Sequence, residues 1–258
     1  MSTAFRSLAV IGVLAQSVVP ATALAQLRPV SPPEGGPGFL FHEPRVTLGV
    51  RGGFNIRSAA RGEIGTWLTD TLTLRHRDFN AFSIAGDVGV AVAGPLELVV
   101  SGGYARTTAP SEYRNWVDQN DQPITQSTTL ETVPLTLAAR WYLTSRGRRI
   151  GHFVWLPARV MPYVGVGGGA VRYALKQTGS FVDIVDFSIF SDAYRSWGWA
   201  PLGMVLAGAD YSLGTRVVMN ADARYVRAKA GLNRDFVQLT DGIDLSGVQV
   251  SLGLHVRI

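Results

Sequence analysis

The chain has 258 residues, with 24 Lys and Arg against 19 Asp and Glu, a formal net charge of +5, and no cysteine. It is 47% hydrophobic and only 17% charged. Because disordered proteins combine low hydrophobicity with high charge, this composition excludes a disordered chain. The lack of cysteine excludes a disulfide scaffold, a thiol enzyme and a cysteine-ligated metal site.

The basic charge is carried almost entirely by arginine, since Lys176 and Lys229 are the only lysines in the sequence. The arginines are spread singly along the chain, whereas nucleic-acid binders gather them in a stripe or patch, so we expect no nucleic-acid partner. After residue 28 no apolar stretch reaches the roughly 20 residues that a spanning helix needs, which excludes a bundle of membrane helices.

Residues 1–26 have the pattern of a secretory signal peptide. Arg6 supplies the positive start, Leu8–Ala15 is the apolar centre, and Ala23 and Ala25 provide the small residues that a signal peptidase reads. The alternative is a retained membrane anchor, but polar residues and a proline directly follow the apolar centre. Residues 27–44 hold five prolines and three glycines, and they predict a periplasmic tail without a fold of its own.

From residue 45 to residue 258, apolar and polar residues alternate in segments typical of β-strands. We expect eight strands, at 45–56, 81–93, 96–107, 130–143, 160–173, 199–212, 216–228 and 246–258. The register of 160–173 stays open, because glycines occupy both of its faces. For 199–212 we favour Val205, Ala207, Ala209 and Tyr211 outward and Asp210 inward.

The connections between these strands run about 24, 2, 22, 16, 25, 3 and 17 residues. Long and short connections alternate, apart from the basic middle one, in which a short amphipathic segment is possible. This alternation is typical of an all-β, eight-stranded, antiparallel up-and-down transmembrane β-barrel. A strand of twelve residues is about 40 Å long, which covers roughly 30 Å when it is tilted by about 40° and so matches a bilayer core.

Alternation alone does not decide which face of such a barrel contacts water. The less apolar face consists of small residues and isolated charges with almost no lysine, whereas a soluble surface is about a quarter to a third charged. We therefore place the bulky aliphatic residues against lipid and the charges in the interior. The predicted interior charge network is Arg51, Asp87, Glu97, Arg140, Asp210, Asp222, Arg224 and Arg257.

This interior set holds four positive and four negative charges, and a buried unpaired charge is costly. The predicted hairpins bring together two pairs, Arg51 with Asp87 and Glu97 with Arg140. The alternative is that these are ordinary surface ion pairs.

Trp and Tyr near the strand ends predict two aromatic girdles at the membrane surfaces: Trp141, Tyr142, Tyr163 and Tyr211 at the short turns, and Tyr104, Tyr173, Trp197, Trp199 and Tyr225 at the long loops.

Three segments, PYVGVGGGAVRY (162–173), LAGADYSLGTRVVMNADARYV (206–226) and IDLSGVQVSLGLHVRI (243–258), resemble the eight-stranded outer-membrane β-barrel family, the OmpA/OmpW-like transmembrane domain. The last segment is similar to the assembly signal of such barrels, with Gly253, Val256 and Ile258 at its glycine and two hydrophobic positions. It departs from the signal at Ile258, where an aromatic residue is usual, and at Val250, where a polar one is usual.

The resemblance implies a monomer in a bacterial outer membrane that is inserted by the barrel-assembly machinery and surrounded by outer-membrane lipids and lipopolysaccharide. Arginines of the first long connection are candidate contacts for lipid headgroups: Arg57, Arg61, Arg75 and Arg77. We expect no cofactor and no metal, because the spacing of Asp183, Asp186 and Asp192 fits no calcium loop.

Three functions remain open, because the interior of an eight-stranded barrel is just filled by side chains. The first is a structural or surface-interaction role through the long extracellular loops at 57–80, 108–129, 174–198 and 229–245. The second, implied by the OmpW-like resemblance, is a narrow conduit for small or hydrophobic solutes, to which inward-facing Gly165, Gly167 and Gly169 would give room.

The third function is an outer-leaflet lipid-modifying enzyme, which needs a base beside a nucleophile near the outer rim. His255 shares a face with Ser251 but lies at the short-turn end, and His76 and Ser83 have no distinctive spacing. We therefore expect that the protein is not an enzyme.

Overall fold

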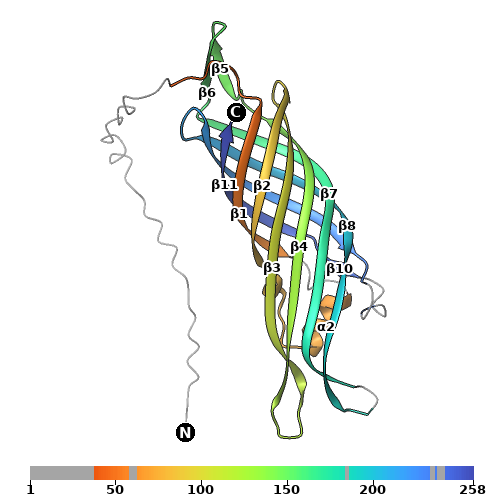
Figure 1. The fold of residues 1–258 in the computed structure, drawn as a ribbon. Coiled ribbons are helices and arrows are strands. Elements are labelled where there is room, and N and C mark those ends of the chain that lie inside the picture. The colour runs from red at the N-terminus through yellow and green to blue at the C-terminus, as the bar shows by residue number, and fades with distance from the viewer. Residues whose placement is uncertain (1–37, 58–62, 184–185, 233–235, 237–241) are drawn as a thin grey trace, which may run out of the picture. The chain divides into compact units, whose positions relative to one another are not determined.

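Eight antiparallel strands close into a barrel in the computed structural model, which describes residues 38–57, 63–183, 186–232, 236 and 242–258 (Figure 1). The strands of the ring are β1 (Val46–Arg57), β2 (Ala81–Ala93), β3 (Leu96–Val117), β4 (Pro123–Tyr142), β7 (Val160–Val182), β8 (Ile189–Ser212), β9 (Val217–Ala230) and β11 (Gly247–Arg257). Each pairs with its neighbour, and β1 pairs with β11 to close the ring. The predicted up-and-down barrel is confirmed, while the predicted signal peptide lies outside the described residues.

Shorter elements occupy the connections. The first long connection contains the helix α2 (Glu63–Thr71) and the 3-10 helix η1 (His76–Phe79), and the last contains β10 (Ile243–Asp244), which pairs with β9. The basic middle connection forms a small hairpin of β5 (Gly147–Ile150) and β6 (Val154–Pro157).

No helix among the described residues combines the length and the apolar character that crossing a membrane requires.

Two of the four predicted long loops are wrong, because they are largely strand. The pairs β3–β4 and β7–β8 continue as long hairpins beyond the rest of the ring (Figure 1), with the β7–β8 ladder unbroken from Val160↔Tyr211 to Val182↔Ile189. Buried and exposed positions still alternate in these extensions, but both kinds are polar, as in the exposed Thr125 beside the buried Gln126 and Thr128. Because the sequence signal for a strand is the alternation of apolar with polar residues, a polar strand has the pattern of a loop.

The two ambiguous strands have a definite register. On β8, Val205 faces outward and Asp210 inward, as predicted. On β7, Gly165 and Gly167 face inward and make room for neighbours, since an added Cβ would lie 3.1 Å from Leu206 Cδ1 and 2.8 Å from Met204 Cε respectively. The expected small and polar interior is therefore wrong along β7 and β8, whose inward residues include Met161, Tyr163, Val171, Tyr173, Leu202, Met204 and Leu206.

Candidate functional site

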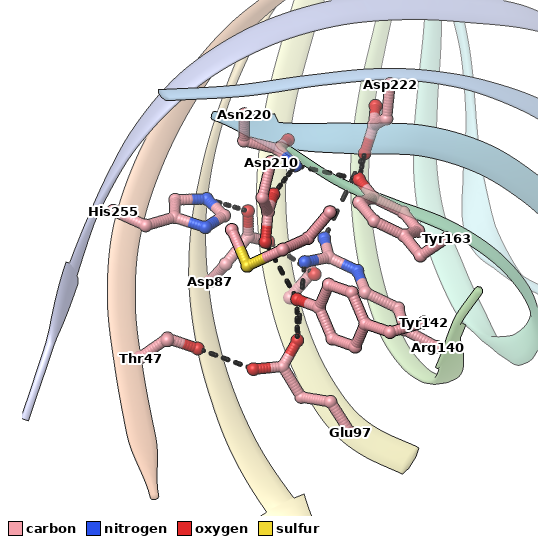
Figure 2. A network of polar contacts seen from close by, with 12 residues as sticks. Thr47, Asp87, Glu97, Arg140, Tyr142, Tyr163, Asp210, Asn220, Asp222 and His255 are labelled. Carbon is pink, nitrogen blue, oxygen red and sulfur yellow. Dashed lines mark hydrogen bonds and ion pairs between the residues drawn. The ribbon is translucent and has the colours of Figure 1, made fainter. Parts of the chain in front are cut away.

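The predicted interior charges all lie at inward positions of the ring strands, and every one is at most 5% exposed. They come from β1, β2, β3, β4, β8, β9 and β11. These side chains therefore come close to one another only when the barrel closes. Figure 2 shows five of them, Asp87, Glu97, Arg140, Asp210 and Asp222, in contact with further polar side chains in the interior. Because burial removes water from these groups, each charge depends on a partner inside the protein.

Arg51 and Asp87 form the first predicted pair, with Arg51 Nη1 2.5 Å from Asp87 Oδ2. They occupy diagonal positions of the β1–β2 ladder, because Asp87 is directly opposite Gly49. Asp87 also accepts a hydrogen bond of 2.5 Å from the Ser101 hydroxyl on β3, and His255 Nε2 on β11 lies 3.5 Å from it. This carboxylate therefore links four strands.

Glu97 and Arg140 form the second predicted pair, at directly opposite positions of β3 and β4, with 3.7 Å between Arg140 Nη1 and Glu97 Oε2. Three more groups converge on Glu97. The Thr47 hydroxyl donates to it at 3.0 Å, the Tyr142 hydroxyl lies 3.0 Å away, and Arg146 Nη2 lies 3.5 Å away. Glu97 thus connects the strands of the ring with the middle connection.

Asp210 and Asp222 extend the network over β8 and β9. Asn220 donates from Nδ2 to Asp210 at 2.6 Å and lies 2.8 Å from the Tyr163 hydroxyl. Arg224 donates to Asp222 from Nε at 3.0 Å and from Nη2 at 2.6 Å. Both bonds end on the same oxygen, Oδ2, and they are stronger than bonds between neutral groups because donor and acceptor are both ionised.

The charge balance differs from the expected four and four, because Arg146 of the middle connection is also buried, at 6% exposed. Arg257, which was counted as part of the balance, contacts neutral groups instead. Its Nη1 donates to the Ser212 hydroxyl at 3.0 Å, and its guanidinium lies 5.6 Å from the centre of the Trp155 ring. Sequence reasoning missed Arg146, because it lies outside the alternating segments.

Tyr142, Tyr163 and Tyr173 were predicted for the girdles, and this is wrong because all three are at most 3% exposed and face the interior. The sequence did contain the signal for Tyr142, since its neighbour Trp141 faces outward and strand neighbours point to opposite faces. The guanidinium of Arg140 lies 4.8 Å from the Tyr163 ring centre, and that of Arg146 lies 5.2 Å from the Tyr142 ring centre. Trp141, Tyr104, Trp197, Trp199 and Tyr225 are exposed at the strand ends, as predicted.

An apolar cluster fills the interior toward the long-loop end. Leu68 of α2, Leu72 and Leu74 after it, and Phe79 of η1 are at most 2% exposed and belong to one core with Leu130 of β4. The first long connection therefore folds back over the barrel and packs into it. Together with the charge network, this cluster fills much of the interior.

A cavity of about 90 Å³ remains between the network and the apolar cluster. Its polar lining includes Arg51, Arg57 and Arg224, and its apolar lining includes Leu202 and Met204. One wall of the cavity is formed by Gly103 and Tyr104 of β3 and Pro134 of β4. There the β3–β4 ladder pauses between the pairs Gly102↔Leu135 and Ala105↔Thr132, and proline has no N–H to donate.

The exterior of the ring is apolar where the interior is charged. Large aliphatic side chains are widely exposed on the outward positions, such as Val50 and Leu252 at 63%, Val166 at 62% and Leu137 at 52%. A closed barrel that exposes hydrocarbon and buries its charges is stable in lipid, where every backbone group is paired within the ring. The chain is an eight-stranded transmembrane β-barrel. Barrels of this kind are outer-membrane proteins, which places the chain in a bacterial outer membrane.

No family model and no curated protein sequence matches the chain. Among solved structures, the barrel is similar to Neisserial surface protein A, with 14% identity, a TM-score of 0.44, and coverage of 87% of this chain and 100% of that one. For OprG from Pseudomonas aeruginosa the identity is 14%, the TM-score 0.45, and the coverage 85% and 99%. For outer membrane protein W from E. coli the identity is 19%, the TM-score 0.37, and the coverage 84% and 100%.

The residues of the predicted assembly signal lie on the last strand of the ring and at its end. Gly253 lies opposite Arg51, and an added Cβ would stand 2.8 Å from Arg51 Cβ. Val256 and Ile258 are exposed on the outside, at 45% and 65%. Recognition of these residues by the assembly machinery stays a prediction.

Proposed function

We propose that this barrel is a monomeric outer-membrane protein that acts by surface interaction, through the hairpins β3–β4 and β7–β8, and not by conduction. The observation that carries the proposal is the length of these hairpins. On β3, residues 106–117 continue past Ala105, the last residue paired with β2. Twelve residues of strand span about 40 Å, which is enough to reach well beyond a lipid surface.

The two hairpins meet near their tips. Trp116 of β3 and Phe187 of the β7–β8 turn stack with ring centres 5.3 Å apart and planes inclined by 21°. Both rings are exposed, at 43% and 60%, and Phe187 has a left-handed backbone with φ of 59°. A bulky residue in this conformation is strained, and such strain concentrates where a side chain must be presented in a fixed direction.

Other loop aromatics support the fold instead of being presented. Phe181 and Phe236 are buried, and the Tyr194 ring lies 4.6 Å from Phe181 and 6.2 Å from Phe236 between ring centres. The stack of Trp116 on Phe187 is therefore the feature on which the surface role depends. The side chain of Trp67, in the first long connection, lies outside the described residues.

Presentation of the hairpins can be tested by labelling, because the chain has no native cysteine. Asp121→Cys places a thiol at the β3–β4 tip, and Gly151→Cys places one at the turn of the β5–β6 hairpin at the opposite end. A membrane-impermeant maleimide should label Asp121→Cys on intact cells, and should label Gly151→Cys only after the outer membrane is permeabilised. Labelling in the reverse order would contradict the proposed orientation.

A narrow conduit is the second candidate, and the pause in the β3–β4 ladder beside the cavity favours it. In this case solutes would pass through the wall near Pro134 and not along the filled axis. Planar-bilayer recording and uptake of a small apolar solute would distinguish the two functions. Uptake that the Pro134→Val variant abolishes would support the conduit, whereas no conductance and no uptake would support the surface role.

Enzymatic activity is not part of the proposal. His76 is exposed on η1, while the Ser83 hydroxyl accepts a hydrogen bond from Gln249 at 2.9 Å. We expect unchanged lipid A masses after expression of the protein.

Contact with lipopolysaccharide is proposed for Arg75 and Arg77, which are exposed. Retention of lipopolysaccharide during purification should fall in the Arg75→Gln/Arg77→Gln variant.

A further inference from the structure

Arg57 does not lie at the lipid surface, where the sequence analysis expected a headgroup contact, but in the interior of the barrel. It ends β1 at an inward position, and its Nη2 donates to the Thr132 hydroxyl on β4 at 2.7 Å. Because β1 and β4 are three strands apart in the ring, this side chain extends across the interior. Its guanidinium lines the cavity.

Arg57 differs from the other interior arginines in the groups that contact its guanidinium. Carboxylates lie within 4.0 Å of Arg51, Arg140, Arg146 and Arg224. Arg257 has neutral partners for both of its Nη atoms, the Ser212 hydroxyl and the Met161 sulfur. Within the described residues, Arg57 has no carboxylate partner, and its Nη1 is buried without any hydrogen bond.

The remaining lining of the cavity does not compensate this charge. Among the described residues it contains two more arginines, Arg51 and Arg224, and no Asp or Glu, and these two arginines pair with Asp87 and Asp222 on the side of the network. Arg57 is half-buried and its buried Nη1 has no hydrogen bond, so its side chain bears a desolvation cost at the cavity that no counter-charge among the described residues offsets. An anion bound there would remove this cost.

The opposite part of the lining is apolar. Val171 of β7 and Leu202 and Met204 of β8 are buried and point into the cavity. The ligand that fits this combination has an acidic head and a hydrocarbon portion. A carboxylate suits the head, because its two oxygens match the planar fork of a guanidinium, and the small volume of the cavity restricts the hydrocarbon to a short chain.

We propose that the cavity is a binding site for a short-chain monocarboxylate, whose acidic group pairs with Arg57 and whose hydrocarbon chain lies against Leu202 and Met204. The site does not depend on the proposed surface role, because a ligand can occupy it whether or not the hairpins meet a partner.

The experiment uses the full barrel folded in detergent micelles, with folding checked by heat-modifiable gel mobility. Hexanoate is titrated by calorimetry, and hexanamide serves as the uncharged probe of the same shape. Hexanoate should bind, and hexanamide should bind at least about tenfold more weakly, because a charge-assisted pair is lost. Equal affinity of the two probes would overturn the proposal.

Two variants locate the site. Arg57→Gln should weaken hexanoate binding by about tenfold or more, whereas Arg227→Gln, which removes an exposed arginine of β9, should leave it unchanged. Arg57→Lys, which keeps the charge, guards against misfolding and should retain part of the affinity. Wild-type affinity in Arg57→Gln would overturn the assignment.

The apolar half of the site is tested separately. Met204→Asn should weaken hexanoate but not acetate. Inorganic phosphate should compete poorly with hexanoate, because it has no hydrocarbon to bury against β8. Phosphate that binds as tightly as hexanoate would overturn the monocarboxylate and indicate a general anion site.

Discussion

The hydroxyl of Tyr142 on β4 donates a hydrogen bond across the interior of the barrel to Asp210 on β8, over 2.8 Å. The same oxygen lies 3.0 Å from Glu97 Oε2 on β3. Because a phenol has one proton, it can donate to only one of these carboxylates at a time. When the proton points to Asp210, Glu97 depends on the neighbouring Arg140 and Arg146 for its stabilisation. Tyr142 therefore connects β3, β4 and β8 within the charge network.

Removing this hydroxyl should destabilise the barrel. Tyr142→Phe leaves two buried carboxylates without their shared donor, so we expect the free energy of unfolding to fall by about 1–3 kcal/mol. Urea unfolding in lipid vesicles, followed by tryptophan fluorescence, measures the change. The control is Tyr225→Phe at an exposed outward position, which should change the free energy of unfolding by less than about 0.5 kcal/mol. Equal losses in both variants would contradict the role of the hydroxyl.

The buried Arg51–Asp87 pair should be far more sensitive than a surface pair. Arg51→Met strands Asp87 as an unpaired buried charge, so the free energy of unfolding should fall by about 3–5 kcal/mol. Replacing both residues, in Arg51→Met/Asp87→Leu, should recover much of that loss, because no charge is left unpaired. Arg106→Met breaks the exposed pair with Glu131 and should cost at most about 1 kcal/mol. A double variant no more stable than Arg51→Met would argue against charge pairing as the cause.

Gly169 on β7 should tolerate no side chain, because an added Cβ would overlap the carbonyl oxygen of Leu135 on β4. We expect Gly169→Ala to lower the free energy of unfolding by about 1–3 kcal/mol or more, since overpacking displaces the backbone. Gly52→Ala is the matched control, because nothing lies within 4 Å of a Cβ at that position of β1. The fraction of folded protein on unboiled gels reports the difference, and a folded Gly169→Ala barrel of wild-type stability would refute the close approach.

The orientation of the two faces can be tested on β11 with adjacent residues. A spin label at Leu252 should contact lipid, and one at Ser251 should be shielded from it, because Leu252 is 63% exposed on the outside and Ser251 is 2% exposed in the interior. Leu137 and Thr136 form the same test on β4. Lipid contact at Ser251 and water contact at Leu252 would contradict the assignment of the two faces, and with it the conclusion that the barrel spans a membrane.

A charge on the outer face should be costly for the same reason. Leu252→Arg places a guanidinium in hydrocarbon, and we expect a loss of about 2–4 kcal/mol in the free energy of unfolding if the residue lies near the bilayer centre. The control is Asp121→Arg, in the turn of the β3–β4 hairpin, which should change the free energy of unfolding little. A stable Leu252→Arg barrel in vesicles would contradict the lipid contact.

The sequence by itself determined the eight strands of the ring, the lipid-facing side of most of them and the burial of eight ionic side chains, but it left the register of β7 open and placed Tyr142, Tyr163 and Tyr173 on the wrong face. These features follow from alternation along one strand, which is a local property that survives any arrangement of the neighbours. The sequence did not reveal the polar continuation of the hairpins, because outward residues such as Thr125 are as polar as the buried Gln126 and Thr128, so no apolar face marks the strand.

The sequence predicted the pairs Arg51–Asp87 and Glu97–Arg140 on neighbouring strands, but only the tertiary structure decided which interior groups of more distant strands meet. The contacts of Tyr142 with Asp210 and of Arg57 with Thr132 join strands that are not neighbours, so they depend on the stagger with which the barrel closes. Arg146 enters the network from a connection, and residues from all eight ring strands line the cavity. Periodicity within a strand carries no information about these distances across the interior, which is why the unpaired charge of Arg57 becomes visible only in the closed barrel.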